Sequence, residues 1–131
     1  MPKGGDTMLE RMKGLPDNVL GFEAKGEVTG ADYESVLIPA VDEMLARRKN
    51  IRFLYHLGSE FTGFDAKAMW DDAKVGLQHL TAWERVAMVT DVGWIRTGMK
   101  AFGFVMPGSF RIFSNSELAE ARQWVSEQGG A

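Results

Sequence analysis

Cysteine is absent from the 131 residues of this chain. Its absence excludes disulfide bonds, thiolate metal sites and thiol catalysis. A basic excess is missing too, because 15 Lys and Arg residues stand against 18 Asp and Glu residues, so nucleic acid is not an expected partner. The polar start MPKGGDT does not resemble a signal peptide, and the most apolar segment is shorter than the roughly 20 residues of a membrane-spanning helix. These absences favour a cytoplasmic protein.

What is present is ordinary for one globular domain. The hydrophobic fraction is 45% and the charged fraction 25%, which are close to the averages for soluble proteins. A chain of this length can bury a core without covalent staples. We therefore expect a flexible tail over residues 1–7 and a single domain over residues 8–131.

The first half of the chain alternates between strand and helix patterns. A short strand over 8–12 and a turn at 16–18 precede a strand from Val19 to Val28, whose period of two predicts one buried and one wet face. These two strands are close enough to pair as a hairpin. Thr29 and Asp32 match a helix cap, and Pro39 bends the following helix or divides it into two pieces.

The next elements are a buried strand over 51–57, a loop over 58–63 and a helix capped by Asp65. The helical wheel of this helix predicts an inward apolar stripe of Ala66, Met69, Trp70, Ala73, Leu77 and Leu80. It predicts an outward, solvated face of Lys67, Asp71, Asp72, Lys74 and Gln78.

A buried strand over 85–90 leads to an apolar helix over 93–107, a strand over 110–113 and a terminal helix capped by Ser114 and Glu117. The resulting order is ββαβαβαβα. Helices between successive strands predict parallel pairing through right-handed crossovers. The expected fold is α/β, with a mixed sheet of about five strands and four or five packed helices.

The helix from Gly93 to Pro107 is unusually apolar for a surface helix and also soft. Gly98 and Gly103 each lower helix stability by about 1 kcal/mol relative to alanine. Phe104 falls with Thr97 and Lys100, away from the apolar stripe of the helix. Two interpretations stay open: a plain core helix whose Phe104 is buried by a homodimer, or a mobile helix that meets a ligand or a membrane surface.

Several motifs in the second half of the chain resemble the SpoIIAA-like family. They are F-x-G-x-D at Phe61 to Asp65, W-D-D at 70–72, E-R-V-A at 84–87, G-W-I-R at 93–96 and A-R-Q-W near the end. The resemblance implies a STAS-like sheet related to bacterial anti-sigma factor antagonists and similar to the lipid-carrying CRAL-TRIO fold. It also implies apolar ligands and membrane association.

The anti-sigma factor antagonists carry a phosphorylated serine in a loop after the buried strand. At that place this chain has Glu60-Phe61-Thr62-Gly63, in which Phe61 replaces the acidic residue and Ser59 is displaced. Ser59 and Thr62 mark the corresponding regulatory loop for a protein partner. A purely structural loop, with Gly63 supplying backbone freedom, is the competing interpretation.

No constellation for catalysis or metal binding emerges, and no cofactor is expected. His56 lies in a buried strand and His79 at a helix end, without neighbours at ligand spacing. Adjacent Asp71 and Asp72 point about 100° apart on a helix and do not form a proton-sharing pair. We therefore expect a protein that is not an enzyme.

The predicted function is a non-enzymatic module that binds a small apolar ligand or lipid, or associates reversibly with the inner membrane surface, through the 93–107 helix. The alternative is a STAS-like regulatory domain with a protein partner. The expected apolar contacts are Trp94, Ile95, Met99, Phe102, Phe104 and Met106. The expected contacts to anionic headgroups are Arg96, Lys100 and Arg111.

Overall fold

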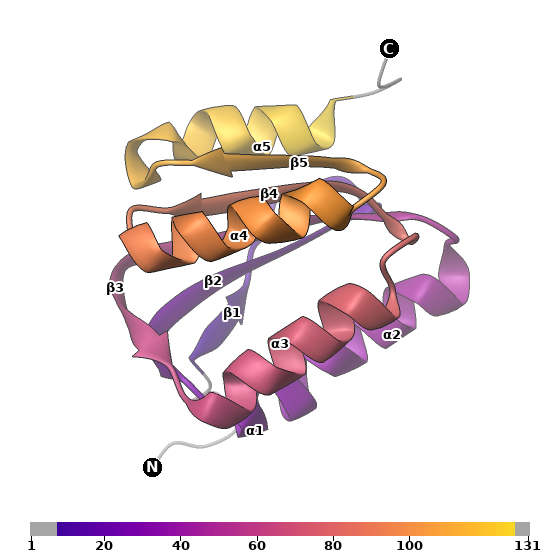
Figure 1. Cartoon of the computed structure of the whole chain (residues 1–131). Helices are drawn as coiled ribbons and strands as arrows, with labels where there is room; N and C mark the ends of the chain where they lie inside the picture. Colours follow the sequence, from indigo (N-terminus) through magenta and orange to yellow (C-terminus); the bar gives the residue numbers. More distant parts are fainter. Residues whose placement is uncertain (1–7, 128–131) are drawn as a thin grey trace.

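The structure is a computed structural model that describes residues 8–127. Its centre is a five-stranded sheet in the order β1-β2-β3-β4-β5 (Figure 1). The first pair is antiparallel and the other pairs are parallel. The mixed sheet and the element order ββαβαβαβα confirm the prediction from the sequence. The strands are β1 (Leu9–Arg11), β2 (Val19–Val28), β3 (Ile51–Phe64), β4 (Trp83–Thr90) and β5 (Ser109–Phe113).

The expected hairpin of the first two strands is confirmed, since Leu9 pairs with Ala24 in an antiparallel ladder. The predicted tail over 1–7 and the last residues, 128–131, lie outside the described part. The expectation of a wet second face on β2 is wrong for the start of the strand, where Val19 and Gly21 are buried. Met12 and Leu15, from the β1–β2 connection, cover that face.

The sequence left a bent helix or two shorter pieces open at Pro39, and the backbone stays helical from Gly30 to Arg47, so the helix is not divided at this residue. Helix α1 (Gly30–Asp32) starts with a capping box in which the Thr29 hydroxyl accepts from the Asp32 amide and the Asp32 carboxylate accepts from the Thr29 amide. A π-helical turn (Tyr33–Leu37) follows, and α2 (Ile38–Arg47) then begins with Pro39 in its first turn. The π-helical turn lies directly before Pro39, a residue that cannot donate a helical hydrogen bond.

The loop predicted over 58–63 is wrong, because β3 continues through this segment to Phe64. The pairing with β2 nevertheless slips here: Ala24 is opposite Leu57, whereas Gly26 is opposite Phe61. The extra β3 residues form a bulge. Gly63 has a φ of 149°, a conformation that favours glycine, so its expected backbone freedom is used within a strand.

Helix α3 (Ala66–Gln78) starts at the predicted Asp65 cap but is rotated relative to the predicted stripe. Its buried residues are Ala68, Asp71 and Val75, whereas Met69, Trp70 and Leu77 of the predicted inward stripe are exposed and Leu80, beyond the helix end, is partly buried. Asp71 is 2% exposed, so the solvated interpretation of this carboxylate is wrong. The reason is that Lys67, one turn earlier on the same helix, pairs with the Asp71 carboxylate at 3.2 Å and compensates its burial.

The last third of the chain follows the prediction closely. Helix α4 (Gly93–Val105) ends before Pro107, and β5 follows. Ser114 and Glu117 form the predicted capping box at a single 3-10 turn (Asn115–Glu117) before α5 (Leu118–Ser126). None of the helices in the described part is long and apolar enough to cross a bilayer.

The helices lie on the two sides of the sheet in unequal number. Three successive right-handed crossovers in one direction place α2, α3 and α4 on the same face, and α5 packs on the other (Figure 1). We call these the three-helix face and the α5 face. The core is accordingly divided into a large cluster around Phe22, Phe53 and Tyr55 and a small one around Leu54, Val89 and Val125.

Candidate functional site

A cavity of about 500 Å³ lies over the three-helix face between α3 and α4. We call it the α3–α4 cavity. Its size falls in the range of about 300–1,000 Å³ that is usual for small-molecule pockets. The sheet supplies the floor through Phe53, Tyr55, Trp83, Val86, Met88 and Phe110. The walls come from Met69, Asp72, Ala73, Val75, Gly76 and Leu77 of α3, from Trp94, Ile95, Gly98, Met99, Ala101, Phe102 and Val105 of α4, and from Leu37 and Phe64.

Asp72 is the one charged residue among these lining residues. Its Oδ1 accepts a hydrogen bond of 2.7 Å from the Tyr33 hydroxyl, which lies 2.9 Å from the Tyr55 hydroxyl. Burial in apolar surroundings raises the pKa of Asp72, and the hydrogen bond from Tyr33 offsets part of that rise. Burial also raises the pKa of Tyr33 and of Tyr55 well above the usual range, so both phenols stay protonated donors.

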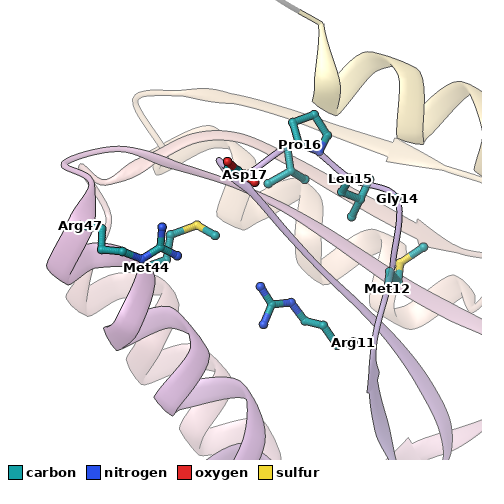
Figure 2. Close-up of a pocket in the computed structure, with 9 residues that line it drawn as sticks. Arg11, Met12, Gly14, Leu15, Pro16, Asp17, Met44 and Arg47 are labelled. Carbon is teal, nitrogen blue, oxygen red and sulfur yellow. The ribbon is translucent and has the colours of Figure 1, made fainter.

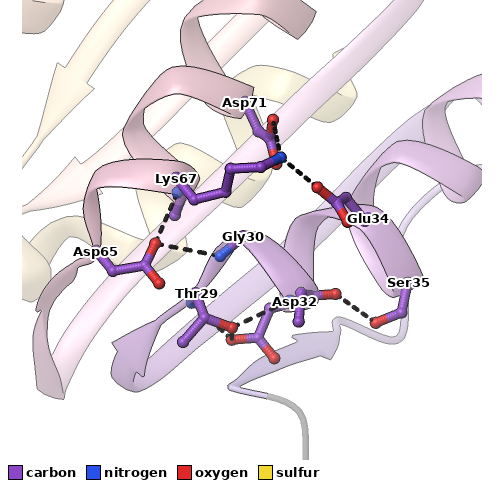
Figure 3. Close-up of polar contacts among 10 residues, drawn as sticks. Thr29, Gly30, Asp32, Glu34, Ser35, Asp65, Lys67 and Asp71 are labelled. Atoms are coloured by element: carbon purple, nitrogen blue, oxygen red, sulfur yellow. Dashed lines mark hydrogen bonds and ion pairs between the residues drawn. The ribbon is translucent and has the colours of Figure 1, made fainter.

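The start of α3 is held by polar contacts with α1 and the π-helical turn (Figure 3). The Asp65 carboxylate accepts from the amides of Ala68 (2.7 Å) and Gly30 (3.2 Å). Lys67 extends across Gly30 and pairs with Glu34 and with Asp71, the latter at 3.2 Å. This network fixes which side of α3 faces inward and turns Asp72 toward Tyr33.

One end of the cavity closes where α3 and α4 approach each other. A Cβ atom at Gly76 would lie 3.2 Å from the Phe102 ring, so the glycine permits this contact. The indole nitrogen of Trp83 donates to the Gly76 carbonyl at 3.0 Å, and Phe102 packs edge-on against Phe110. Along the rest of α4 only Ile95 is buried, which leaves the cavity wall accessible.

The predicted apolar residues of α4 divide into three groups. Trp94, Ile95, Met99 and Phe102 line the cavity. Met106 is buried in the core, and Phe104 points away from the cavity with 93% of its surface exposed. The exposed large apolar side chains of the described residues gather on α3 and α4, and they are Met69, Trp70, Leu77, Trp94, Phe104 and Val105.

The three predicted headgroup cations do not lie together. Arg96 donates to the carbonyl oxygens of Thr90 (2.7 Å) and Phe113 (3.1 Å), so it ties α4 to the strand ends. The guanidinium of Arg111 lies 4.7 Å from the Phe113 ring centre, on the α5 face. Of the two predicted cations on α4, Lys100 is the exposed one. The structure therefore does not bring these cations into one patch.

Ser59 and Thr62, the predicted regulatory residues, are both exposed on the bulged part of β3. The nearby α3 N-terminus is already capped by the Asp65 carboxylate, which would repel a phosphate at Thr62. His56 lies in β3, with its Nδ1 buried 3.7 Å from Glu23, and His79 ends α3. Within residues 8–127, no group of three His, Asp or Glu side chains is arranged to hold a metal ion.

A second, smaller pocket of about 170 Å³ lies between the β1–β2 connection and the end of α2 (Figure 2). Arg11, Asp17 and Arg47 give it a polar lining, and Met12 and Met44 supply sulfur groups. Both arginines are exposed. The pocket offers no deep apolar surface, so the α3–α4 cavity is the stronger candidate site.

The sequence interpretation missed the polar end of the cavity and its whole α3 wall. Asp72, Tyr33 and Tyr55 lie far apart along the chain, and only the fold brings their hydroxyl and carboxyl groups together. A signal for the α3 wall was present, however. Helix α3 carries two apolar stripes, one through Ala68 and Val75 and one through Met69 and Leu77, and a single sheet covers only one of them.

Comparisons with known proteins agree with this architecture. A family model described as SpoIIAA-like matches residues 19–126. A solved structure from Shewanella loihica PV-4 is similar to this chain, with a TM-score of 0.71 and 28% sequence identity. The alignment covers 89% of this chain and 91% of that protein, which is described as an uncharacterized member of the DUF3478 family with a SpoIIAA-like fold. No curated protein matches the chain.

Proposed function

This chain belongs to the SpoIIAA-like family, and within that family we propose that it acts as a non-enzymatic module that binds a small apolar molecule in the α3–α4 cavity. The observation that carries the proposal is the cavity itself. An opening of about 500 Å³ lined mainly by aromatic and aliphatic side chains has the size and the lining that are usual for small-molecule sites.

The energetics favour an apolar occupant. Covering apolar surface contributes about 25 cal/mol for each Å² removed from water. A ligand between α3 and α4 would cover the rim side chains Met69, Leu77 and Trp94, which the folded chain leaves largely exposed. Because α4 buries only Ile95 and contains Gly98 and Gly103, small shifts of this helix adjust the width of the cavity.

The experiment is a fluorescence titration with N-phenylnaphthylamine, a neutral apolar dye. A Cβ atom at Gly98 would meet nothing within 4 Å, so Gly98→Leu places a side chain in the open space of the cavity. Thr97→Leu adds the same side chain one position away, outside the lining residues. We expect dye binding by the wild type and by Thr97→Leu, and its loss in Gly98→Leu. Equal binding, or none by any of the three, would contradict the proposal.

Reversible membrane association is a second candidate, favoured by the exposed apolar side chains on α3 and α4. Phe104 is 93% exposed and Trp70 is 63% exposed, and large apolar groups of this kind insert into the headgroup region of a bilayer. Lys100 on α4 and Lys74 on α3 are exposed cations near these side chains, and two cations make a small electrostatic contribution.

Co-sedimentation with anionic phospholipid vesicles tests this second candidate. A Trp94→Ser, Phe104→Ser double variant removes two exposed aromatic groups. The wild type should pellet with vesicles and the double variant should stay in solution. Equal pelleting of both proteins would rule the candidate out.

The regulatory alternative predicts that Thr62→Glu releases a bound protein partner. The structural feature in its favour is the exposure of Thr62.

A further inference from the structure

Asp72 stands out because it is a carboxylate in an apolar cavity and has no ion-pair partner among residues 8–127. The neighbouring Asp71 is neutralised by Lys67 at 3.2 Å. No Lys, Arg or His is among the residues that line the α3–α4 cavity. A carboxylate in such surroundings carries a desolvation cost that a hydrogen-bond donor or a cation relieves.

The chain supplies only part of that compensation. The Tyr33 hydroxyl, 2.7 Å from Oδ1, is the single hydrogen-bond donor to Asp72 among residues 8–127. When Tyr33 donates to Asp72, the hydroxyl of Tyr55 must donate to Tyr33, at 2.9 Å, so the three groups have a fixed direction. An ionised carboxylate accepts about four hydrogen bonds. Acceptor capacity therefore remains on Asp72, at the wall of the cavity.

From this arrangement we infer that the occupant is an amphiphile with an apolar chain and a head that donates hydrogen bonds, a primary amine or an alcohol. This inference rests on the proposed function, because it assigns the polar contact within the same cavity. The head would sit against Asp72, and the chain would run over the floor formed by Phe53, Val86 and Met88. An anionic head would meet an unneutralised carboxylate at the same place.

Competition against N-phenylnaphthylamine tests the head preference with three amphiphiles of equal chain length: decylamine, decanol and decanoate. At about pH 8 the amine is protonated and the carboxylic acid is ionised. Decylamine and decanoate are used below their critical micelle concentrations, and decanol below its solubility limit. A hydrogen bond to a charged group corresponds to about tenfold in affinity, so decylamine and decanol should displace the dye about tenfold more strongly than decanoate.

Asp72→Asn is the diagnostic variant, since asparagine retains an acceptor for Tyr33 without the charge. Displacement by each amphiphile is expressed relative to the variant's own affinity for the dye, and on that scale we expect the preference for the amine over decanoate to disappear. Asp42→Asn, the same change at an exposed position of α2, should keep the preference. If the dye binds but the order of the three heads is unchanged in Asp72→Asn, or if decanoate is the strongest competitor, the inference is overturned. If the dye does not bind the wild type, the proposed function itself is contradicted, and the inference that rests on it is contradicted as well.

Discussion

The two faces of the sheet are covered in opposite ways. On the α5 face, one helix of 9 residues seals the small core cluster, in which Ala121 and Val125 are fully buried. On the three-helix face, three longer segments enclose a core and still leave a cavity of about 500 Å³. The number of covering helices therefore does not determine how completely a face is packed.

The difference lies in how the helices are attached. Arg52, 5% exposed, donates to the carbonyl oxygens of Val125 (3.0 Å) and Glu127 (2.6 Å), and Arg85 donates to that of Trp124. These contacts hold the end of α5 against the middle of the sheet. Helix α3 is held by polar contacts at its start, and α4 by Arg96. The exposed apolar side chains lie toward the ends of these two helices: Met69, Trp70 and Leu77 on α3, and Trp94, Phe104 and Val105 on α4.

The largest expected effect comes from placing a charge on each face. Val125→Asp puts a carboxylate at a fully buried position of α5 and should lower the free energy of unfolding by about 4 kcal/mol. Val105→Asp, on the rim of the cavity, should change it by about 0.5 kcal/mol because the position is exposed. Urea unfolding measures both values. A similar cost for the two variants would mean that the three-helix face is as tightly packed as the α5 face.

Tyr33→Phe should have the next largest effect, because it removes the link between Asp72 and Tyr55. Two buried polar groups would lose their partner, at a cost of about 1–3 kcal/mol. The double variant Tyr33→Phe, Tyr55→Phe should cost less than the sum of the single changes, since one buried hydroxyl then no longer needs a partner. Additive costs in chemical denaturation would show that the three groups do not act as one network.

Gly98→Leu should stabilise the protein in the absence of ligand. Replacing a helical glycine by leucine contributes about 1 kcal/mol through backbone entropy, and the cavity accepts the new side chain without a clash. Thr97→Leu provides the control for helix propensity alone. Thermal unfolding of both variants separates the two effects. A destabilised Gly98→Leu would indicate that this side of α4 already packs against α3.

The smallest expected effect is a pH-dependent rise in the melting temperature on the substitution Asp72→Asn. The pKa of Asp72 is raised in the folded state, chiefly by desolvation, so this carboxyl reduces stability as pH rises from its unfolded pKa through its folded pKa. Tyr33 and Tyr55, the groups that face it, stay protonated over that range. Asp72→Asn should therefore raise the melting temperature above the folded pKa and leave it nearly unchanged below the unfolded pKa. A rise in melting temperature that is the same at every pH would contradict this account.

Local signals made much of the fold predictable. The caps at Thr29, Asp65 and Ser114 are satisfied by side chains three residues away or by the first helical amides, so short sequence patterns contain them in full. The irregular helical turn before Pro39 coincides with the one residue of that helix that cannot donate a backbone hydrogen bond. Alternating strands and helices then determine the order and parallel pairing of the later strands.

The candidate site was only half predictable, because its geometry depends on contacts between distant segments. The apolar excess of α4 indicated a surface with an unusual role, and Trp94, Met99 and Phe102 do line the cavity. The rotation of α3 accompanies two contacts with the π-helical turn, Lys67 with Glu34 and Asp72 with Tyr33, and a helical wheel of α3 alone does not contain Glu34 or Tyr33. The distance between two helix middles leaves no sequence pattern, so the cavity itself could not be predicted.

Methionine-methyl NMR tests the central claim most directly, because methionines are distributed over both pockets. Met69, Met88 and Met99 line the α3–α4 cavity, whereas Met12 and Met44 line the smaller pocket near β1. On titration of methyl-labelled protein with decanol, the account predicts shifts of the first three signals and none of the other two. Shifts centred on Met12 and Met44, or no shift at all up to the solubility limit of decanol, would contradict it.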